Sequence, residues 1–299
     1  AIENGRHFLR THQYEKALKI FRRVEKQGQK SESAAMEDTL PEKELIQVAN
    51  DPKTAGSYYL STALWKQNLQ EPTEERTARA LDSQINFVKK HGNSLFGAAV
   101  HLRLGHYYRG VVNQLLPAAG AFRHVIDGNG SIDQKHEAFW FLLQCYKNLS
   151  EWDESYRIAR RLLAEYPNHP KAHLVHLEIG YILKERGQYS QAIEYLETVL
   201  EWAQGDIAAQ ARYYIGESFQ EMGQYRDAIE RYYRVSFHGS GAYAGWINSA
   251  DFKRAQCHEE LGEFEQAANI YDRIIRREGK ESEFGKIAKK GLIRVVNAQ

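Results

Sequence analysis

The chain has 299 residues, 42% hydrophobic and 26% charged, a balance that is typical of a folded protein and excludes a disordered one. Its 40 basic and 39 acidic side chains give a formal net charge of +1, which argues against nucleic-acid binding because phosphate contacts need a basic surface. No apolar run approaches the roughly 18 residues of a membrane-spanning helix, and the first residues show no signal-peptide pattern.

Pairs of amphipathic helices are predicted from the first residue onward. Apolar side chains recur at helical spacing in residues 1–27, 56–91 and 94–127, which predicts three helical hairpins. A polar insert at 28–55 separates the first two hairpins and is too short to form a domain of its own. The stretch 67–74 is predicted to lengthen the turn of the second hairpin.

The second half of the chain continues the series. A capping box begins at Ser131, where a serine is followed three residues later by Gln134. Four further hairpins are predicted at 132–166, 170–204, 206–238 and 244–279. The last stretch, 281–299, has one apolar helical face and is predicted to cap the stack, since a terminal element needs a polar outer surface.

A short phrase repeats at the centre of the later hairpins. It begins Gly187-Gln188-Tyr189, returns 36 residues later at Gly223 and again 39 residues later at Gly262. The glycine supplies the left-handed conformation that ends the first helix. Small residues 12 apart, such as Gly180 and Ala192, are predicted to let the two helices approach closely.

This pattern resembles the tetratricopeptide repeat, which has small residues at its eighth and twentieth positions. The resemblance covers nearly the whole chain, residues 1–299, and implies an all-α fold. We therefore expect a single right-handed superhelical solenoid of about seven hairpins and a C-terminal capping helix. One hairpin cannot bury its apolar faces alone, so neighbouring hairpins must stack.

The resemblance also implies where a partner would bind. In this family the first helices line a concave groove with their fifth, ninth and twelfth positions. The fifth positions are apolar or aromatic, and they are Leu102, Trp140, Leu177, Tyr213 and Phe252. The ninth position of the fifth hairpin is Tyr181, and the twelfth positions of the third to fifth hairpins are basic, Arg109, Lys147 and Lys184. The alternative is that the fifth-position side chains pack between neighbouring first helices.

The preferred function is a non-catalytic scaffold or adaptor that holds a partner peptide or protein segment in this groove. The basic twelfth positions give way to Glu259 in the seventh hairpin, so the partner is expected to place an acidic segment over the basic end. Two alternatives remain open: a self-associating assembly unit, and a regulatory repeat domain of a larger protein. The ninth positions include no asparagine, which argues against binding of the acidic tails of chaperones.

Three fragments invite a chemical interpretation that their context does not support. The stretch 127–138 begins like a calcium loop but lacks the required glycine and final glutamate. The glycine-rich stretch 239–245 follows a helix, whereas a phosphate loop follows a strand. The histidine cluster around His173 and His176 lacks a third zinc ligand. We therefore expect no enzyme activity, no cofactor and no metal.

The two cysteines, Cys145 and Cys257, occupy the same position of their repeats and lie three repeats apart. They are predicted to be small buried hydrophobic residues and not a disulfide. The phrases at 211–217 and 232–235 resemble those of bacterial cell-envelope repeat proteins. That resemblance implies a soluble protein of the bacterial periplasm or envelope, and a cytoplasmic location is also compatible.

Overall fold

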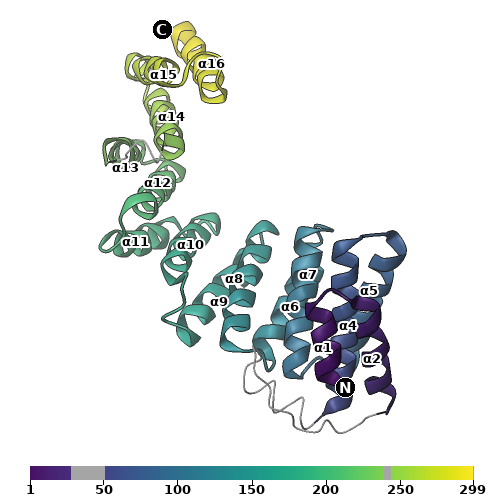
Figure 1. Ribbon diagram of the computed structural model, residues 1–299. Helices are drawn as coiled ribbons and strands as arrows, with labels where there is room; N and C mark the ends of the chain where they lie inside the picture. Colours follow the sequence, from purple (N-terminus) through teal and green to yellow (C-terminus); the bar gives the residue numbers. More distant parts are fainter. Residues whose placement is uncertain (28–50, 239–243, 299) are drawn as a thin grey trace. The chain divides into compact units, whose positions relative to one another are not determined.

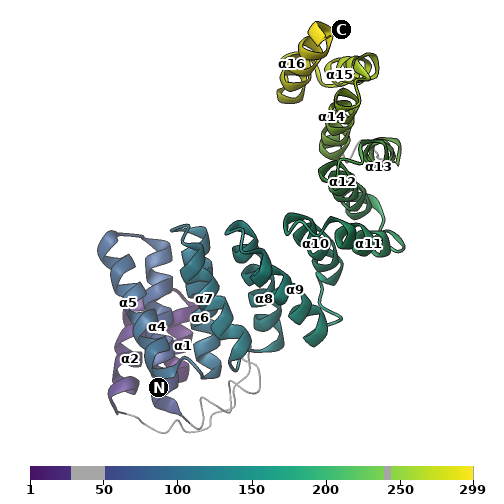
Figure 2. The same ribbon diagram turned by 180° about the vertical axis from the view of Figure 1, so that it is seen from behind.

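The computed structural model describes residues 1–27, 51–238 and 244–298, and all of its regular elements are α-helices. The all-α prediction is thus confirmed for these residues. The chain forms two compact units, residues 1–150 and 151–299, which are described separately (Figures 1 and 2). The unit boundary falls inside the hairpin predicted at 132–166. Most of the predicted insert and of the glycine-rich stretch lies outside the described residues.

Unit 1 holds three helical hairpins followed by a single helix. Its helices are α1 (Ile2–Arg10), α2 (Tyr14–Gln27), α4 (Pro52–Gln70), α5 (Glu74–His91), α6 (Leu95–Gly110), α7 (Leu115–Asp127) and α8 (Ile132–Asn148). Each helix packs against the next along the chain, and α4 also packs on α1 and α8 on α6. The predicted capping box starts α8, with reciprocal hydrogen bonds between Ser131 and Gln134.

Unit 2 begins with one helix and continues with three hairpins and a terminal helix. Its helices are α9 (Trp152–Glu165), α10 (Ala172–Glu185), α11 (Tyr189–Leu200), α12 (Gly205–Glu221), α13 (Tyr225–His238), α14 (Ala244–Glu260), α15 (Phe264–Glu278) and α16 (Glu283–Ala298). The first helices α10, α12 and α14 pack on their own second helices and on one another in sequence, and α16 packs on α15. Side chains on these first helices therefore form one continuous surface.

The two helices of a hairpin meet where a glycine faces a large side chain. A Cβ added at Gly180 would lie 2.2 Å from Leu196, and one added at Gly216 would lie 2.7 Å from Tyr232. The sequence paired Gly180 with Ala192, whereas the side chain that covers the glycine comes one turn later. The small residue is needed because a large ring or branched side chain fills the space that its own side chain would occupy.

The hairpin turns adopt the left-handed conformation that the sequence predicted. Gly187, Gly223 and Gly262 have φ of 72°, 72° and 71°. The backbone N–H of Gln188 donates to Leu183 O at 2.9 Å, which is the hydrogen bond that closes a helix C-terminus of this type. In unit 1 the equivalent turns use His12 (φ 59°) and Asn113 (φ 53°).

The second hairpin departs from its predicted boundaries at both ends of its first helix. The insert was expected to run to residue 55, but α4 begins at Pro52, where the side chain of Asp51 accepts a hydrogen bond from Thr54 N at 3.1 Å. The stretch 67–74 was expected to lengthen the turn. Instead α4 continues to Gln70 and only three residues separate it from α5. Asp51 as N-cap and proline in the first turn explain the early start.

Candidate partner-binding surface

The fifth-position residues that were predicted to line a groove are partly or fully covered. In unit 2, Leu177 is 4% exposed and Tyr213 is 9% exposed, and both belong to the hydrophobic core. Leu177 packs with Leu196 of its own hairpin and with Ala211 of the next first helix. The alternative that these side chains pack between neighbouring hairpins therefore describes Leu177 and Tyr213.

The other fifth-position residues are half-buried. Phe252 packs against the core of the last hairpin, with its ring centroid 5.6 Å from that of Tyr271. Leu102 and Trp140 lie on α6 and α8 of unit 1. The predicted strip is thus divided between the two units.

The twelfth-position charge of unit 2 is neutralised inside the protein. The ammonium of Lys184 lies 2.8 Å from a carboxylate oxygen of Glu217 on the next first helix and 2.8 Å from one of Glu185. The Lys184 side chain is 12% exposed. The same ammonium lies 5.0 Å from the ring centroid of Tyr181 and 5.6 Å from that of Tyr214. Lys184 therefore joins α10 to α12 and offers no unpaired positive charge to a partner.

The remaining twelfth-position charges also have partners within the protein. The guanidinium of Arg109 lies over the Phe141 ring, 4.5 Å from its centroid. Lys147 is half-buried at the end of α8. The carboxylate of Glu259 accepts hydrogen bonds at 2.6 and 2.7 Å from Arg294 of α16, which lowers the pKa of Glu259 despite the opposing effect of burial. Glu259 thus binds the capping helix α16, and its negative charge is paired with Arg294 and not available to a partner.

Unit 2 carries a row of half-buried aromatic side chains across α9 and the first helices α10, α12 and α14. The row runs from Trp152 of α9 to Tyr181 of α10, Tyr214 of α12 and Trp246 of α14, with ring centroids 6.0, 5.1 and 6.1 Å apart in turn. We call these four residues the aromatic row. Tyr214 packs against the cores on both sides of it, and Trp246 packs on the buried Tyr213.

Carboxylates surround the hydroxyl groups of this row. Burial is the main reason that the pKa values of Tyr181 and Tyr214 are raised, and nearby carboxylates raise them further. Glu178 acts on both tyrosines, Glu185 acts on Tyr181, and Glu217 acts on Tyr214. Lys184, whose ammonium lies over both rings, acts in the opposite direction on the pKa of Tyr181.

Sequence reasoning found Tyr181 and missed the other members of the row. Tyr214 occupies the sixth position of its repeat, next to the predicted Tyr213, and it is the one of the two that keeps exposed surface. Trp152 and Trp246 stand at the starts of their helices, outside the positions considered. The doublet Tyr213-Tyr214 was a usable signal, because adjacent helical residues point about 100° apart and one of two rings can face outward.

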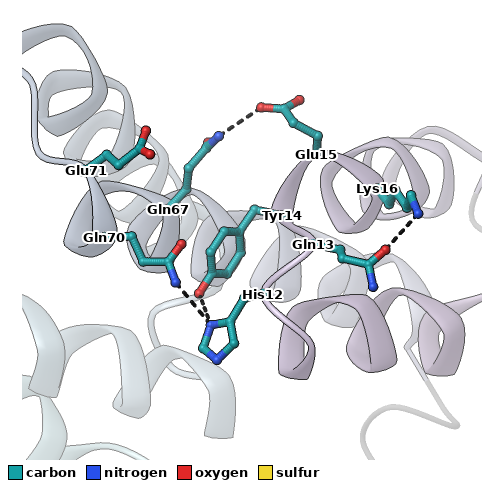
Figure 3. A pocket seen from close by; sticks show the side chains of 8 residues that line it. All are labelled: His12, Gln13, Tyr14, Glu15, Lys16, Gln67, Gln70 and Glu71. Atoms are coloured by element: carbon teal, nitrogen blue, oxygen red, sulfur yellow. Dashed lines mark hydrogen bonds between the residues drawn. The ribbon is translucent and has the colours of Figure 1, made fainter.

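Unit 1 has a polar cavity of about 340 Å³ between the turn of its first hairpin and the end of α4 (Figure 3). His12 Nδ1 lies 2.8 Å from the Tyr14 hydroxyl and 3.2 Å from Gln70 Nε2, so these three side chains point toward one another. Gln67 Nε2 donates to Glu15 at 2.8 Å. Its lining groups already bond to each other, and these contacts link the turn of the first hairpin to α4.

The fragments that invited a metal interpretation have structural partners. His169 Nδ1 accepts from Lys171 N at 3.0 Å, and His176 Nδ1 lies 2.7 Å from the Tyr195 hydroxyl. Within residues 1–27, 51–238 and 244–298, no three His, Cys, Asp or Glu side chains are grouped to hold a metal ion. Across the same ranges, no helix combines the length and apolar character that crossing a membrane requires.

Both cysteines are buried free thiols, as the shared repeat position predicted. Burial raises the pKa of Cys145 to about 11 and that of Cys257 to about 12. A thiol of such high pKa is almost wholly protonated near neutral pH and is a poor nucleophile.

Comparison with known proteins agrees with the fold. Models of the tetratricopeptide repeat match residues 175–206, 210–236 and 249–279. No curated protein sequence matches the chain significantly. Residues 175–279 of unit 2 are thus similar to tetratricopeptide repeats.

Solved structures share its architecture at low sequence identity. A structure of Naa15/Naa10 bound to HypK-THB matches at 15% identity with a TM-score of 0.58, over 99% of this chain and 38% of that chain. A tetratricopeptide repeat protein from Parabacteroides merdae matches at 14% identity and a TM-score of 0.45, over 99% of this chain and 97% of that chain. The type IV pilus biogenesis factor PilW matches at 17% identity and a TM-score of 0.49, over 77% and 97%. The first of these similarities concerns the fold alone.

Proposed function

We propose that the protein is a non-catalytic scaffold that holds a segment of a partner protein on the first helices of unit 2. The aromatic row carries this proposal, because it forms a continuous strip of partly exposed rings over α9, α10, α12 and α14. Tyrosine and tryptophan supply large contact areas with few rotatable bonds and are enriched among residues that dominate binding energy. Of the predicted groove residues, Tyr181 belongs to the row and Lys184 lies over two of its rings, whereas Leu177 and Tyr213 lie in the core beneath it.

The similarity of residues 175–279 to tetratricopeptide repeats supports this kind of function. Tetratricopeptide repeats are interaction modules, and repeat stacks present extended surfaces to partners. These observations favour a scaffold over an enzyme.

Site-specific cross-linking in the native host tests the proposal. A photo-reactive phenylalanine analogue at Tyr214 should capture the partner, whereas the same analogue at Trp202 should not. Trp202 is a matched control because it is an aromatic side chain of unit 2 that is 47% exposed and lies outside the row. The cross-linked segment is then identified by mass spectrometry.

The captured partner allows a quantitative second step. Replacing Tyr214 with Leu should weaken binding of the purified partner by about 1–2 kcal/mol, as loss of an aromatic anchor does, while Trp202→Leu should leave the affinity unchanged. Calorimetric titration measures both. Equal affinities for the two variants would exclude the row as the binding surface. Capture of a second copy of the chain would instead support the self-associating alternative, for which α16 offers exposed Ile293 and Val296.

A further inference from the structure

The sequence contains two Asn-Gly pairs, Asn4-Gly5 and Asn129-Gly130. An asparagine followed by glycine is especially prone to spontaneous deamidation, because glycine has no side chain to block the approach of its N–H to the asparagine side-chain carbonyl. In a folded protein the reaction also depends on the backbone around the pair. The structure places the two pairs in opposite settings, one inside a helix and one in a connection between helices.

Asn4-Gly5 is protected by its helix. Both residues belong to α1, and the Gly5 N–H donates to the carbonyl of Ala1 at 3.0 Å. Gly5 is buried, and a Cβ added to it would lie 2.5 Å from the Phe21 ring, so this turn of α1 is held against α2. Closing a ring between Asn4 and Gly5 requires the backbone to leave its helical dihedral angles. Reaction at this pair therefore depends on local unfolding of α1.

Asn129-Gly130 lies in the connection between α7 and α8, directly before the capping box at Ser131. Asn129 is exposed, and neither residue of the pair belongs to a helix. In the part of the chain that the structure describes, the Gly130 N–H donates to no backbone carbonyl. The nucleophilic nitrogen is thus free of the helical hydrogen bond that holds Gly5, and water reaches the exposed asparagine.

One hydrogen bond constrains the Asn129 side chain. Its Nδ2 amide donates to the carbonyl of Asn93 at 2.7 Å, which joins the connection between α7 and α8 to the connection between α5 and α6. An exposed hydrogen bond exchanges readily with water, so it slows the reaction by no more than about tenfold. Deamidation removes this bond, because a carboxylate accepts hydrogen bonds and cannot donate one.

From the contrast between the two pairs, we infer that Asn129 is a site of spontaneous deamidation in the folded protein, independent of the proposed function. The Gly130 nitrogen attacks the side-chain carbonyl carbon of Asn129 and forms a C–N bond. The amide leaves as ammonia, which takes the proton of the Gly130 N–H, and a succinimide ring remains. Water then opens the ring at one of its two carbonyls and yields aspartate or isoaspartate. The formal net charge of the chain falls from +1 to zero, because one carboxylate is added.

Ageing of the full chain at mildly alkaline pH tests the inference. Peptide mapping by mass spectrometry measures, at each pair, the mass increase that replacement of NH2 by OH produces. Asn129 should be converted at least about fivefold faster than Asn4 in the folded protein, because only Asn4 depends on local unfolding. In urea the two rates should become similar, since both pairs then lie in flexible chain. Equal rates in the folded protein, or an unmodified Asn129, would overturn the inference.

Variants assign the charge change to this pair. Ion-exchange chromatography of the aged wild-type chain should resolve a more acidic species. Asn129→Gln should remove most of it, because glutamine closes the larger ring slowly, while its amide remains a hydrogen-bond donor. The matched change Asn4→Gln should leave the acidic species unchanged. Its persistence in Asn129→Gln, or its loss in Asn4→Gln, would place the reaction elsewhere and overturn the inference.

Discussion

The two units build the same helical hairpin with different turn residues. Unit 2 places Gly187, Gly223 and Gly262 at the left-handed position, whereas unit 1 places His12 and Asn113 there. A Cβ in this conformation costs roughly 1–2 kcal/mol, less for asparagine. Unit 1 keeps the hairpin because the close contact between a glycine of the first helix and a large side chain of the second helix is also present there. A Cβ added at Gly5 or Gly105 would lie 2.5 or 2.6 Å from a phenylalanine ring of the second helix.

This difference explains why the two units are unequally recognisable. Family models match only residues 175–279 of unit 2, although unit 1 holds three hairpins. The turn glycine is a strong sequence signal, but the contact between a small and a large residue decides the geometry. A hairpin can therefore lose the signal and keep the structure.

The units also differ in how they accommodate a buried arginine. In unit 1, Arg103 donates to the neutral Gln84 Oε1 at 2.8 Å, and burial lowers the pKa of Arg103. In unit 2, Asp251 is 1% exposed and lies 3.2 Å from Arg254 and 3.0 Å from Arg277. Unit 2 thus depends on one buried carboxylate for two guanidinium groups.

The largest expected effect comes from removing that carboxylate. Asp251→Asn should destabilise the protein by about 3–5 kcal/mol, because the buried Arg254 would lose its negative partner. Urea unfolding measures the loss, and hydrogen exchange should locate it in unit 2. The matched control is Asp272→Asn, which breaks a surface pair with Arg276 and should cost less than about 1 kcal/mol. Similar losses for both variants would show that the buried network is not essential.

Unit 1 should be the more sensitive to acid through a buried histidine. Burial, and then the neighbouring His124, lowers the pKa of His101 to about 4 from 6.5. As pH falls, the His101 imidazole therefore takes up a proton in the unfolded chain before it does so in the folded protein. Its contribution to the free energy of unfolding is fully present above pH 6.5 and is lost as pH approaches 4. The loss should reach up to about 3 kcal/mol.

Urea midpoints measured across this pH range check the expectation. His101→Phe should flatten the pH dependence of unit 1, whereas His173→Gln, at an exposed position of unit 2, should leave the profile unchanged. An unaltered profile for His101→Phe would assign the acid sensitivity to other groups.

The smallest effects should come from exchanging the turn residues of the two units. Gly223→Ala should destabilise unit 2 by about 1 kcal/mol or more, because alanine disfavours the left-handed backbone. Asn113→Gly should stabilise unit 1 by less than about 1 kcal/mol, since asparagine already tolerates that conformation. Thermal melting detects both. Changes of the same sign would mean that backbone strain does not distinguish the turns.

Prediction from sequence succeeded for features that depend on residues close together in the chain. It was less complete for the burial of side chains, which depends on contacts with neighbouring hairpins. The left-handed glycine turns and the capping box at Ser131 depend on residues a few positions apart, and both are confirmed. The partner residues of the first helices were harder to predict. Leu177 and Tyr213 were placed in a groove but pack in the core, while the half-buried Tyr214 next to Tyr213 was missed.

By itself, the sequence determined the all-α architecture, the helical hairpins and their similarity to tetratricopeptide repeats, because helical periodicity and turn chemistry depend on residues within single hairpins. Tertiary structure alone decided which side chains remain available. Lys184 is a free cation in the sequence, yet it is neutralised by Glu217, 33 residues away on the next first helix. The charge and exposure of a surface shared by several helices depend on contacts between hairpins, which no single repeat encodes.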